Sequence, residues 1–344
     1  MWIFLFICVG ILLVIFLILL SMAIKIRKNV FSCRYDDKHT LKYYETSDFP
    51  SMQEKPISFK SQKITINGKL YSSKEFDSYK ALIVLCHALG PGHKPYMKII
   101  DELIKKDYLV LAFDVRGCEL SEGKNVIGFG SALINLNDCL KYVESDKELS
   151  SYPLILLGHS MGGYAVNNIT RYNHKINGII SISSCNTSYG CLYEELTHTS
   201  GMAMGIFKFF FRIFDFLKFG KKGTYASIDA FEQSDIDHLL IAGKLDTIMD
   251  YHFNQEFFET QLEDNPHYTF LDVEDRYHQA YVTKEAADYD NKTTIEYYEL
   301  KGEHQGKIPP TINKAYYDSL DREKLNELDP MVMNTIFEFI EKHI

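Results

Sequence analysis

The sequence lacks an excess of positive charge, and it contains neither internal repeats nor a low-complexity tract. Its 344 residues include 37 Lys and Arg against 46 Asp and Glu, which gives a formal net charge of −9. Proteins that bind nucleic acid normally present a basic face to the phosphate groups. The charge balance therefore argues against nucleic acid as a partner, and the proportions of 46% apolar and 24% charged residues are typical of a globular chain.

The sequence also lacks the spacings of metal ligands. Its seven cysteines are scattered and odd in number, which does not indicate a disulfide framework and favours a reducing compartment. No H-x-x-x-H pair and no clustered carboxylates occur, so we expect no metal and no cofactor. We interpret the cysteines as small apolar residues that are buried or partly buried.

Charge is absent from the start of the chain. Residues 2–24, which are 23 residues, contain no charged side chain, and this length suffices to cross a hydrocarbon core of about 30 Å. A cleaved signal peptide is the alternative, because residues 21–23 (Ser-Met-Ala) resemble a cleavage site. The run is longer than the apolar part of a signal peptide and no basic residues precede it, so we predict an uncleaved single-pass anchor.

Basic residues directly follow this apolar segment. They are Lys25, Arg27, Lys28, Arg34 and Lys38. Positively charged flanks tend to stay on the cytoplasmic side of a membrane. We therefore predict a membrane protein whose remaining residues lie in the cytoplasm.

The rest of the chain is predicted to form a linker and one large domain. We assign residues 1–28 to the anchor and its basic flank, 29–60 to a polar linker, and 61–344 to an α/β domain. An antiparallel edge hairpin that turns at Asn67-Gly68 is expected first. Continuous apolar runs, which suit strands buried on both faces, follow at residues 81–87, 108–114, 153–158, 176–182 and 238–243. They alternate with helical patterns, which indicates a mostly parallel central sheet with helices on both faces.

The sequence Gly-His-Ser-Met-Gly-Gly at residues 158–163 lies between an apolar run and a helical pattern. This arrangement is typical of a strand, a sharp turn and a helix, with Ser160 at the tip of the turn. The serine of a G-x-S-x-G turn has a strained backbone, so its neighbours must be small. Ligands of parallel sheets bind at the carboxyl ends of strands, where Ser160, His87 and Asp114 are all expected.

These features together resemble the α/β-hydrolase superfamily. The resemblance rests on the turn at Ser160, the His-x-x-Gly loop that begins at His87, and the Asp-x-x-Gly turn that begins at Asp114. It is strongest to the serine-aminopeptidase-like and monoglyceride-lipase-like branch, including membrane-anchored bacterial members, and covers roughly residues 60–344. It implies the α/β-hydrolase fold with a cap insertion. The usual His-Gly pair is replaced here by His87-Ala88.

A serine hydroxyl needs a general base, and the base needs an orienting carboxylate. The superfamily places them in the order serine, acid, histidine. Asp246 follows a predicted strand in the sequence Gly-x-x-Asp and matches the acid position, with Asp250 as the runner-up. His278 comes one helix, one strand and a turn after the acid, and His304 is the alternative base. We predict a triad of Ser160, Asp246 and His278.

The oxyanion formed during acyl transfer needs backbone N–H donors. We expect one from Met161, which follows the nucleophile at the start of a helix. The resemblance implies a second from Leu89. We interpret His87, His93 and Asp114 as residues that brace the loops around the site.

Residues 184–236 interrupt the alternation of strands and helices. They include an aromatic and basic run at residues 202–219 that we expect to be helical. The resemblance implies a cap over the pocket, which favours an apolar acyl or alkyl substrate. The alternatives are a helix that packs on the core and a surface that contacts lipid.

The predicted function is that of a membrane-anchored serine hydrolase that forms an acyl-enzyme on Ser160. Its expected substrates are carboxylic esters, either small acyl esters or monoglyceride-like lipids. One alternative is a catalytically silent binding module of the same fold. The other is an aminopeptidase, for which the sequence assigns no amine-binding acid in the cap. The oligomeric state does not follow from the sequence.

Overall fold

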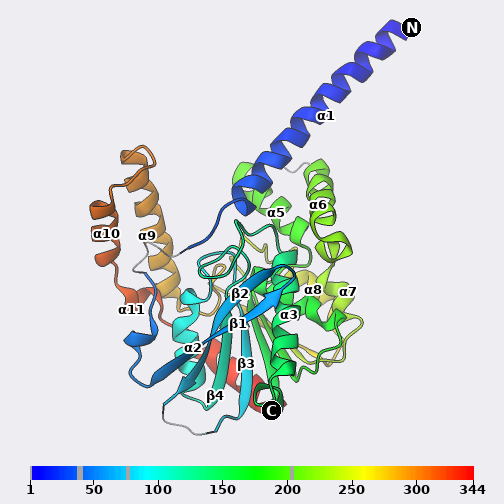
Figure 1. The fold of residues 1–344 in the computed structure, drawn as a ribbon. Helices are drawn as coiled ribbons and strands as arrows, with labels where there is room; N and C mark the ends of the chain where they lie inside the picture. The colour runs from blue at the N-terminus through cyan, green and yellow to red at the C-terminus, as the bar shows by residue number, and fades with distance from the viewer. Residues whose placement is uncertain (1, 37–41, 75–77, 202–204) are drawn as a thin grey trace.

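The computed structural model of the chain describes residues 2–36, 42–74, 78–201 and 205–344. An eight-stranded sheet forms its centre, and the long helix α1 (Trp2–Phe31) projects away from it (Figure 1). Two parts of the sequence predictions, Lys38 and residues 202–204, lie outside the described residues.

The sheet has the strand order β1-β2-β4-β3-β5-β6-β7-β8. The strands from β3 to β8 are parallel to one another, whereas β1 and β2 are antiparallel to their neighbours. The parallel strands are β3 (Ala81–Cys86), β4 (Tyr108–Phe113), β5 (Leu154–His159), β6 (Gly178–Ile182), β7 (His238–Gly243) and β8 (Tyr268–Val273). Every residue of β3 to β7 is buried, which explains their continuous apolar runs. The predicted mostly parallel sheet is confirmed.

The sheet begins earlier in the chain than the sequence predicted. Strand β1 (Met52–Ser61) lies within residues 29–60, which were expected to be linker, and pairs with β2 (Ile64–Ser73). β1 is an edge strand with polar residues on its exposed face. Its Pro56 is compatible with an edge position, where a strand has one side without a partner. This composition hid the strand from the sequence analysis.

The predicted turn at Asn67-Gly68 is wrong, because β2 continues through both residues. The chain reverses instead at Gln62, which has a φ of 54°. Gly68 serves a different purpose. A Cβ atom at this position would lie 2.4 Å from the carbonyl oxygen of Ala112 in β4, so glycine permits the close pairing of β2 with β4.

Helices cover both faces of the sheet, as predicted. The chain contains α2 (Met97–Ile104), α3 (Gly130–Ser145), α4 (Met161–Asn168), α8 (Gln255–Leu262) and α12 (Pro330–His343) around the sheet. Short 3₁₀ helices occur at η1 (Thr46–Asp48), η2 (Lys94–Tyr96), η3 (Leu149–Ser151), η4 (Ile169–Arg171) and η5 (Gly220–Thr224). Apolar residues of α3 and α4 belong to one core cluster, and those of α2 and α12 belong to a second. The side chain of Asp329 accepts the N–H groups of Met331 and Val332 and is therefore the N-cap of α12.

Residues 184–236, the cap segment, connect β6 to β7. They form α5 (Ser188–Ser200), α6 (Gly205–Phe219) and α7 (Ser227–Phe231). At the start of this segment the Sγ atoms of Cys185 and Cys191 approach each other closely. Cys191 lies in the first turn of α5, which brings it back toward Cys185.

A second group of helices lies between β8 and α12. It comprises α9 (Lys284–Glu303), α10 (Pro310–Asp318) and α11 (Arg322–Leu325), and it projects from the domain on the other side of α1 from α6 (Figure 1). The run at residues 294–300 lies within α9 and is helical. Its β-branched and aromatic residues favour a strand locally, but the ring of Tyr297 packs against Tyr316 and Tyr317 of α10.

Helix α1 is the part of the described chain that is long and apolar enough to cross a membrane, by length and composition alone. It continues three residues beyond the predicted boundary at residue 28 and ends at Phe31. Most of its side chains are exposed, but Ala23 and Phe31 are buried against the domain. The side chain of Asn125 donates a hydrogen bond to the carbonyl oxygen of Phe31. The last turns of α1 are therefore part of the folded domain.

Candidate active site

Ser160 lies in the sharp turn between β5 and α4. Its backbone has a φ of 58° and a ψ of −117°, a conformation that residues other than glycine adopt only under strain. A Cβ atom on Gly158 would lie 2.4 Å from the carbonyl oxygen of Gly162, and one on Gly162 would lie 1.9 Å from that of Cys86. These glycines let the turn close and α4 pack on β3. The serine is thereby held at the carboxyl end of the sheet.

Asp246 follows β7 at the same edge of the sheet. Its Oδ1 accepts the backbone N–H groups of Ile248 and Met249, at 2.8 and 3.0 Å. Its Oδ2 lies 2.8 Å from Nδ1 of His278, and the carboxylate side chain is fully buried. Glycine is required three residues earlier, because a Cβ atom on Gly243 would lie 2.3 Å from the carbonyl oxygen of Arg276. The approach of the histidine loop to β7 thus depends on Gly243.

The structure brings His278, and not His304, to Asp246. His304 is the residue at which α9 ends, far along the projecting helices (Figure 1). The runner-up acid, Asp250, is occupied elsewhere: its Oδ2 lies 2.6 Å from Nε2 of His198 in α5. Because Nδ1 of His278 faces the carboxylate, its Nε2 is the ring nitrogen left for the pocket.

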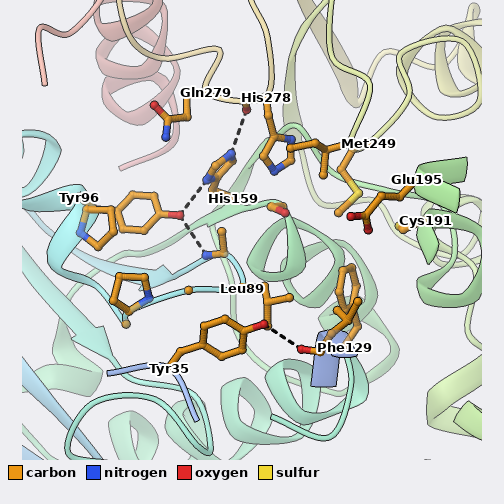
Figure 2. A pocket seen from close by; sticks show the side chains of 18 of the residues that line it. Tyr35, Leu89, Tyr96, Phe129, His159, Cys191, Glu195, Met249, His278 and Gln279 are labelled. Carbon is orange, nitrogen blue, oxygen red and sulfur yellow. Dashed lines mark hydrogen bonds between the residues drawn. The ribbon is translucent and has the colours of Figure 1, made fainter. Parts of the chain in front are cut away.

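A cavity of about 410 Å³ lies above the carboxyl ends of the strands, and Figure 2 shows its lining. Ser160 and His278 both line it, together with Leu89 from the loop after β3. The cap segment contributes Cys191, Leu192 and Glu195, and the end of α1 contributes Asn29 and Val30. The predicted nucleophile, base and oxyanion loop therefore share one pocket, with the cap segment and the N-terminal helix in its wall.

A hydrogen-bond network that the sequence analysis missed joins three loops of the site. The hydroxyl of Tyr96 lies 2.7 Å from Nδ1 of His159, and Nε2 of His159 lies 3.0 Å from the carbonyl oxygen of His278. Because a carbonyl oxygen only accepts, Nε2 carries the proton, and the Tyr96 hydroxyl donates to Nδ1. The same hydroxyl accepts the N–H of Ala88 at 3.0 Å (Figure 2).

This network requires a neutral imidazole. Burial, reinforced by the nearby His278, lowers the pKa of His159 to about 3, so the ring stays uncharged at physiological pH. It connects the loop after β3, the serine turn and the histidine loop. The sequence gives one signal for it, namely that His159 directly precedes Ser160, but nothing local identifies Tyr96 as its partner.

The two predicted oxyanion donors lie in suitable places. Met161 is the first residue of α4, and Leu89 lines the cavity. The N–H of Ala88 already bonds to Tyr96, which leaves the N–H of Leu89 as the candidate in this loop. The first four N–H groups of a helix have no partner within the helix, so that of Met161 is available for an anion.

The histidines near this loop brace it. Nε2 of His87 accepts the N–H of Val115 at 2.8 Å, and burial lowers the pKa of His87. Nδ1 of His93 lies 2.8 Å from Asp114, and its Nε2 lies 2.7 Å from the hydroxyl of Tyr71. These buried contacts fix the loop after β3 against β2 and β4.

Glu195 is a second residue of the cavity that the sequence analysis did not identify. It projects from α5 near Met249 (Figure 2). Burial raises the pKa of its carboxyl group, and the nearby His278 opposes this rise. No residue type or spacing marks Glu195 in the sequence, because only the folding of α5 over the sheet brings it to the pocket.

Comparisons with known proteins agree with this architecture. The sequence model of the family described as serine aminopeptidase, S33, matches residues 77–191. Human monoglyceride lipase is 36% identical over 85 residues, which are 24% of this chain and 28% of that protein. The rat protein of the same name is 35% identical over 85 residues, with the same shares of each chain. The chain thus matches less than a third of the length of these relatives.

Solved structures extend the likeness over most of the domain. An esterase from Pyrococcus furiosus is 17% identical, with a TM-score of 0.56 over 78% of this chain and 98% of that one. An α/β-hydrolase from Vibrio vulnificus is 14% identical, with a TM-score of 0.53 over 72% of this chain and 82% of that one. The chain therefore has the α/β-hydrolase fold. Over the shorter matched stretches, its sequence is similar to serine aminopeptidases and monoglyceride lipases.

Proposed function

We propose that the protein is a serine hydrolase that cleaves carboxylic esters. The observation that carries the proposal is the contact of 2.8 Å between Oδ2 of Asp246 and Nδ1 of His278, since His278 lines the cavity that also contains the strained Ser160. A carboxylate, an imidazole and a serine in this relation form the arrangement that activates a hydroxyl for acyl transfer. The proteins named monoglyceride lipase and esterase among the relatives support the same reaction class.

In this mechanism Oγ of Ser160 attacks the ester carbonyl carbon, and Nε2 of His278 takes the hydroxyl proton. Asp246 holds the imidazole in orientation and stabilises its positive charge. The N–H groups of Met161 and Leu89 stabilise the oxyanion. The imidazolium then protonates the departing alcohol as the C–O bond breaks, which leaves an acyl group on Ser160. Water activated by His278 releases the acid and restores the serine.

A fluorophosphonate probe tests this proposal, because it phosphonylates an activated serine. We expect the folded protein to be labelled at neutral pH on the peptide that contains Ser160, and the Ser160→Ala variant to remain unlabelled. A folded wild-type protein that resists the probe would instead favour the catalytically silent binding module.

The apolar part of the cavity wall supports a proposal for the substrate class. The wall includes Val30, Leu89, Phe129, Leu192 and Met249, so the cavity suits an acyl or alkyl chain better than a polar group. We propose small acyl esters or monoglyceride-like lipids as substrates. A series of p-nitrophenyl esters of increasing acyl length, compared with monoacylglycerols, would locate the preference.

Glu195 favours aminopeptidase activity as a second candidate. A carboxylate in the wall of the pocket could bind the ammonium group of an aminoacyl substrate, and the matched family model is that of a serine aminopeptidase. Matched ester and aminoacyl reporters decide between the two activities. In the aminopeptidase case Glu195→Gln would raise KM for the aminoacyl reporter and leave that for the ester reporter unchanged.

We also propose that residues 2–24 anchor the protein in a membrane as a single pass, with the domain on the cytoplasmic side. The uncharged length of α1 and the basic residues after it support this arrangement. Protease digestion of intact cells decides: a domain cleaved from outside would reverse the orientation.

A further inference from the structure

Helix α6 of the cap segment has apolar residues on a buried face and on the exposed face next to it. One face, with Phe207, Phe210 and Phe211, is buried. The other carries Phe209 and Phe216, which are 53% and 52% exposed, together with Ile213 and Leu217. The spacing i, i+4, i+7 and i+8 places these four exposed side chains in one stripe along the helix. A helix of a water-soluble cap would be expected to carry polar residues there.

The stripe contains no charged residue. Lys208 and Arg212 lie beside it, but their side chains reach over the rings of Tyr193 and Tyr189 in α5. The other basic residues of this region, Lys218, Lys221 and Lys222, lie at the carboxyl end of α6 and in η5. The stripe is therefore apolar, and the charged residues of α6 lie beside it or at its carboxyl end.

Helix α6 packs directly on α1, which fixes its depth relative to the proposed anchor (Figure 1). The rings of Phe16 and Phe210 meet edge to face with centroids 5.3 Å apart. At the other end of the contact, Arg27 forms an ion pair with Asp215 at 2.8 Å. The two helices thus run side by side, with the apolar contact farther from the domain and the ionic contact nearer to it.

These contacts define the position of α6 along the membrane normal. Ile24 is the last residue of α1 before the first charged side chain, and Phe16 lies eight residues closer to the amino terminus. With a rise of 1.5 Å per residue, Phe16 is about 12 Å along the helix axis from that boundary. If residues 2–24 span a bilayer, then Phe210 lies beside acyl chains, whereas Asp215 and the lysines after it lie at the level of the headgroups.

We propose that α6 lies within the membrane leaflet beside α1, with its stripe of Phe209, Ile213, Phe216 and Leu217 in contact with lipid. The occupant of this surface is the leaflet that α1 enters, because α6 packs on α1 and its stripe is as apolar as the exposed side chains of α1. Amphipathic helices with basic residues at the edge of an apolar face occupy this position in a membrane. The proposal rests on the proposed anchoring by residues 2–24.

The position of the cavity gives the proposal a functional meaning. Asn29 and Val30, which directly follow the ion-paired turn of α1, line the cavity that contains Ser160. Its wall is therefore built at the level of the headgroups, and a substrate resident in the leaflet reaches it without crossing water. This consequence rests also on the proposed hydrolase function.

Quenching of tryptophan fluorescence by lipids brominated on their acyl chains tests the position of α6. The full chain has a single tryptophan, Trp2, so the Trp2→Phe background carries one new reporter at a time. The reporters are Phe209→Trp and Phe216→Trp in the stripe. The control is Ile344→Trp at the carboxyl terminus, at the opposite end of the molecule from the free end of α1 (Figure 1).

In phosphatidylcholine vesicles with brominated chains, we expect both stripe reporters to be quenched at least about twofold more than the control. Equal quenching of all three reporters would overturn the proposal. This result is expected if α6 faces water, or if another protein or a second copy of the chain covers the stripe. The readout does not depend on turnover. A failed fluorophosphonate reaction would therefore remove the hydrolase proposal and leave this test intact.

Discussion

Arg27 of α1 and Asp215 of α6 form an ion pair with an N–O distance of 2.8 Å, although 188 residues separate them in the sequence. Both side chains are largely buried, and Asp215 also accepts the hydroxyl hydrogen of Ser188 at 2.7 Å. The same guanidinium donates to the carbonyl oxygen of Ile127. Arg27 therefore joins the N-terminal helix, the cap segment and the loop before α3 at one point.

Removing one charge of this pair is expected to destabilise the fold. In Asp215→Asn the buried Arg27 loses its counter-ion, and breaking such a pair costs about 3 kcal/mol of unfolding free energy. Chemical denaturation in detergent micelles measures the change. The control is Asp288→Asn, which breaks the exposed pair with Lys284 and should cost less than about 0.5 kcal/mol. Equal losses in the two variants would contradict the structural role of Arg27.

Substituting each of the two candidate histidines in turn distinguishes the predicted base from its alternative. His278→Ala should reduce ester turnover by at least about 10⁴-fold, because the serine then has no proton acceptor. His304→Ala should keep turnover within about twofold, since this residue caps α9 outside the cavity. Initial rates with a short-chain ester provide the measurement. Loss of turnover in His304→Ala alone would invalidate the assignment of His278.

Gly243 controls the approach of the histidine loop to β7. In Gly243→Ala the new methyl group would meet the carbonyl oxygens of Arg276 and Tyr277, at 2.3 and 2.4 Å, so the loop must move. A displacement of about 1 Å in a catalytic group can cost roughly 10²-fold in rate, and we expect kcat to fall by that order. Gly302→Ala in α9 is the control, since a Cβ atom there meets no atom within 4 Å. A fully active Gly243→Ala enzyme would argue against this role.

Stability should decrease in mild acid because buried histidines must stay neutral. Burial lowers the pKa of His238 from 6.5 to about 4. Between these values the unfolded chain binds a proton that the folded chain does not. The unfolding free energy therefore falls as the pH drops from about 6.5 to about 4. Thermal unfolding between pH 7 and pH 4.5 should show a smaller decrease for His238→Phe than for the wild type, and identical decreases would refute the assignment.

The central strands could be predicted from the sequence because each is buried on both faces by its own apolar run, as in β3 and β7. Strand β1 could not, since an edge strand leaves residues such as Gln53 and Glu54 in water and resembles a loop. Residues 294–300 include β-branched and aromatic side chains that locally favour a strand, but they are helical, and Tyr297 packs on α10. The local sequence pattern does not predict the secondary structure where packing against residues distant in sequence determines it.

The candidate site likewise contains residues that can be predicted from the sequence and residues that cannot. Ser160, Asp246 and His278 follow strands at recognisable spacings, so the sequence suffices to name them. Tyr96 and Glu195 reach the cavity only through the folding of other elements. The contact between α1 and α6 also cannot be predicted from the sequence. The apolar residues of each helix can be interpreted without reference to the other helix.

The presence of Asn29 and Val30 in the wall of the cavity affects how the protein should be prepared for assay. Hydrophobic N-terminal helices are commonly deleted to obtain a fragment that dissolves without detergent. A fragment that begins after Phe31 would lose these two residues and leave Asp215 without its counter-ion. Substrate preferences measured on it would describe a wider pocket, open to water on one side, so specificity should be measured on the intact chain.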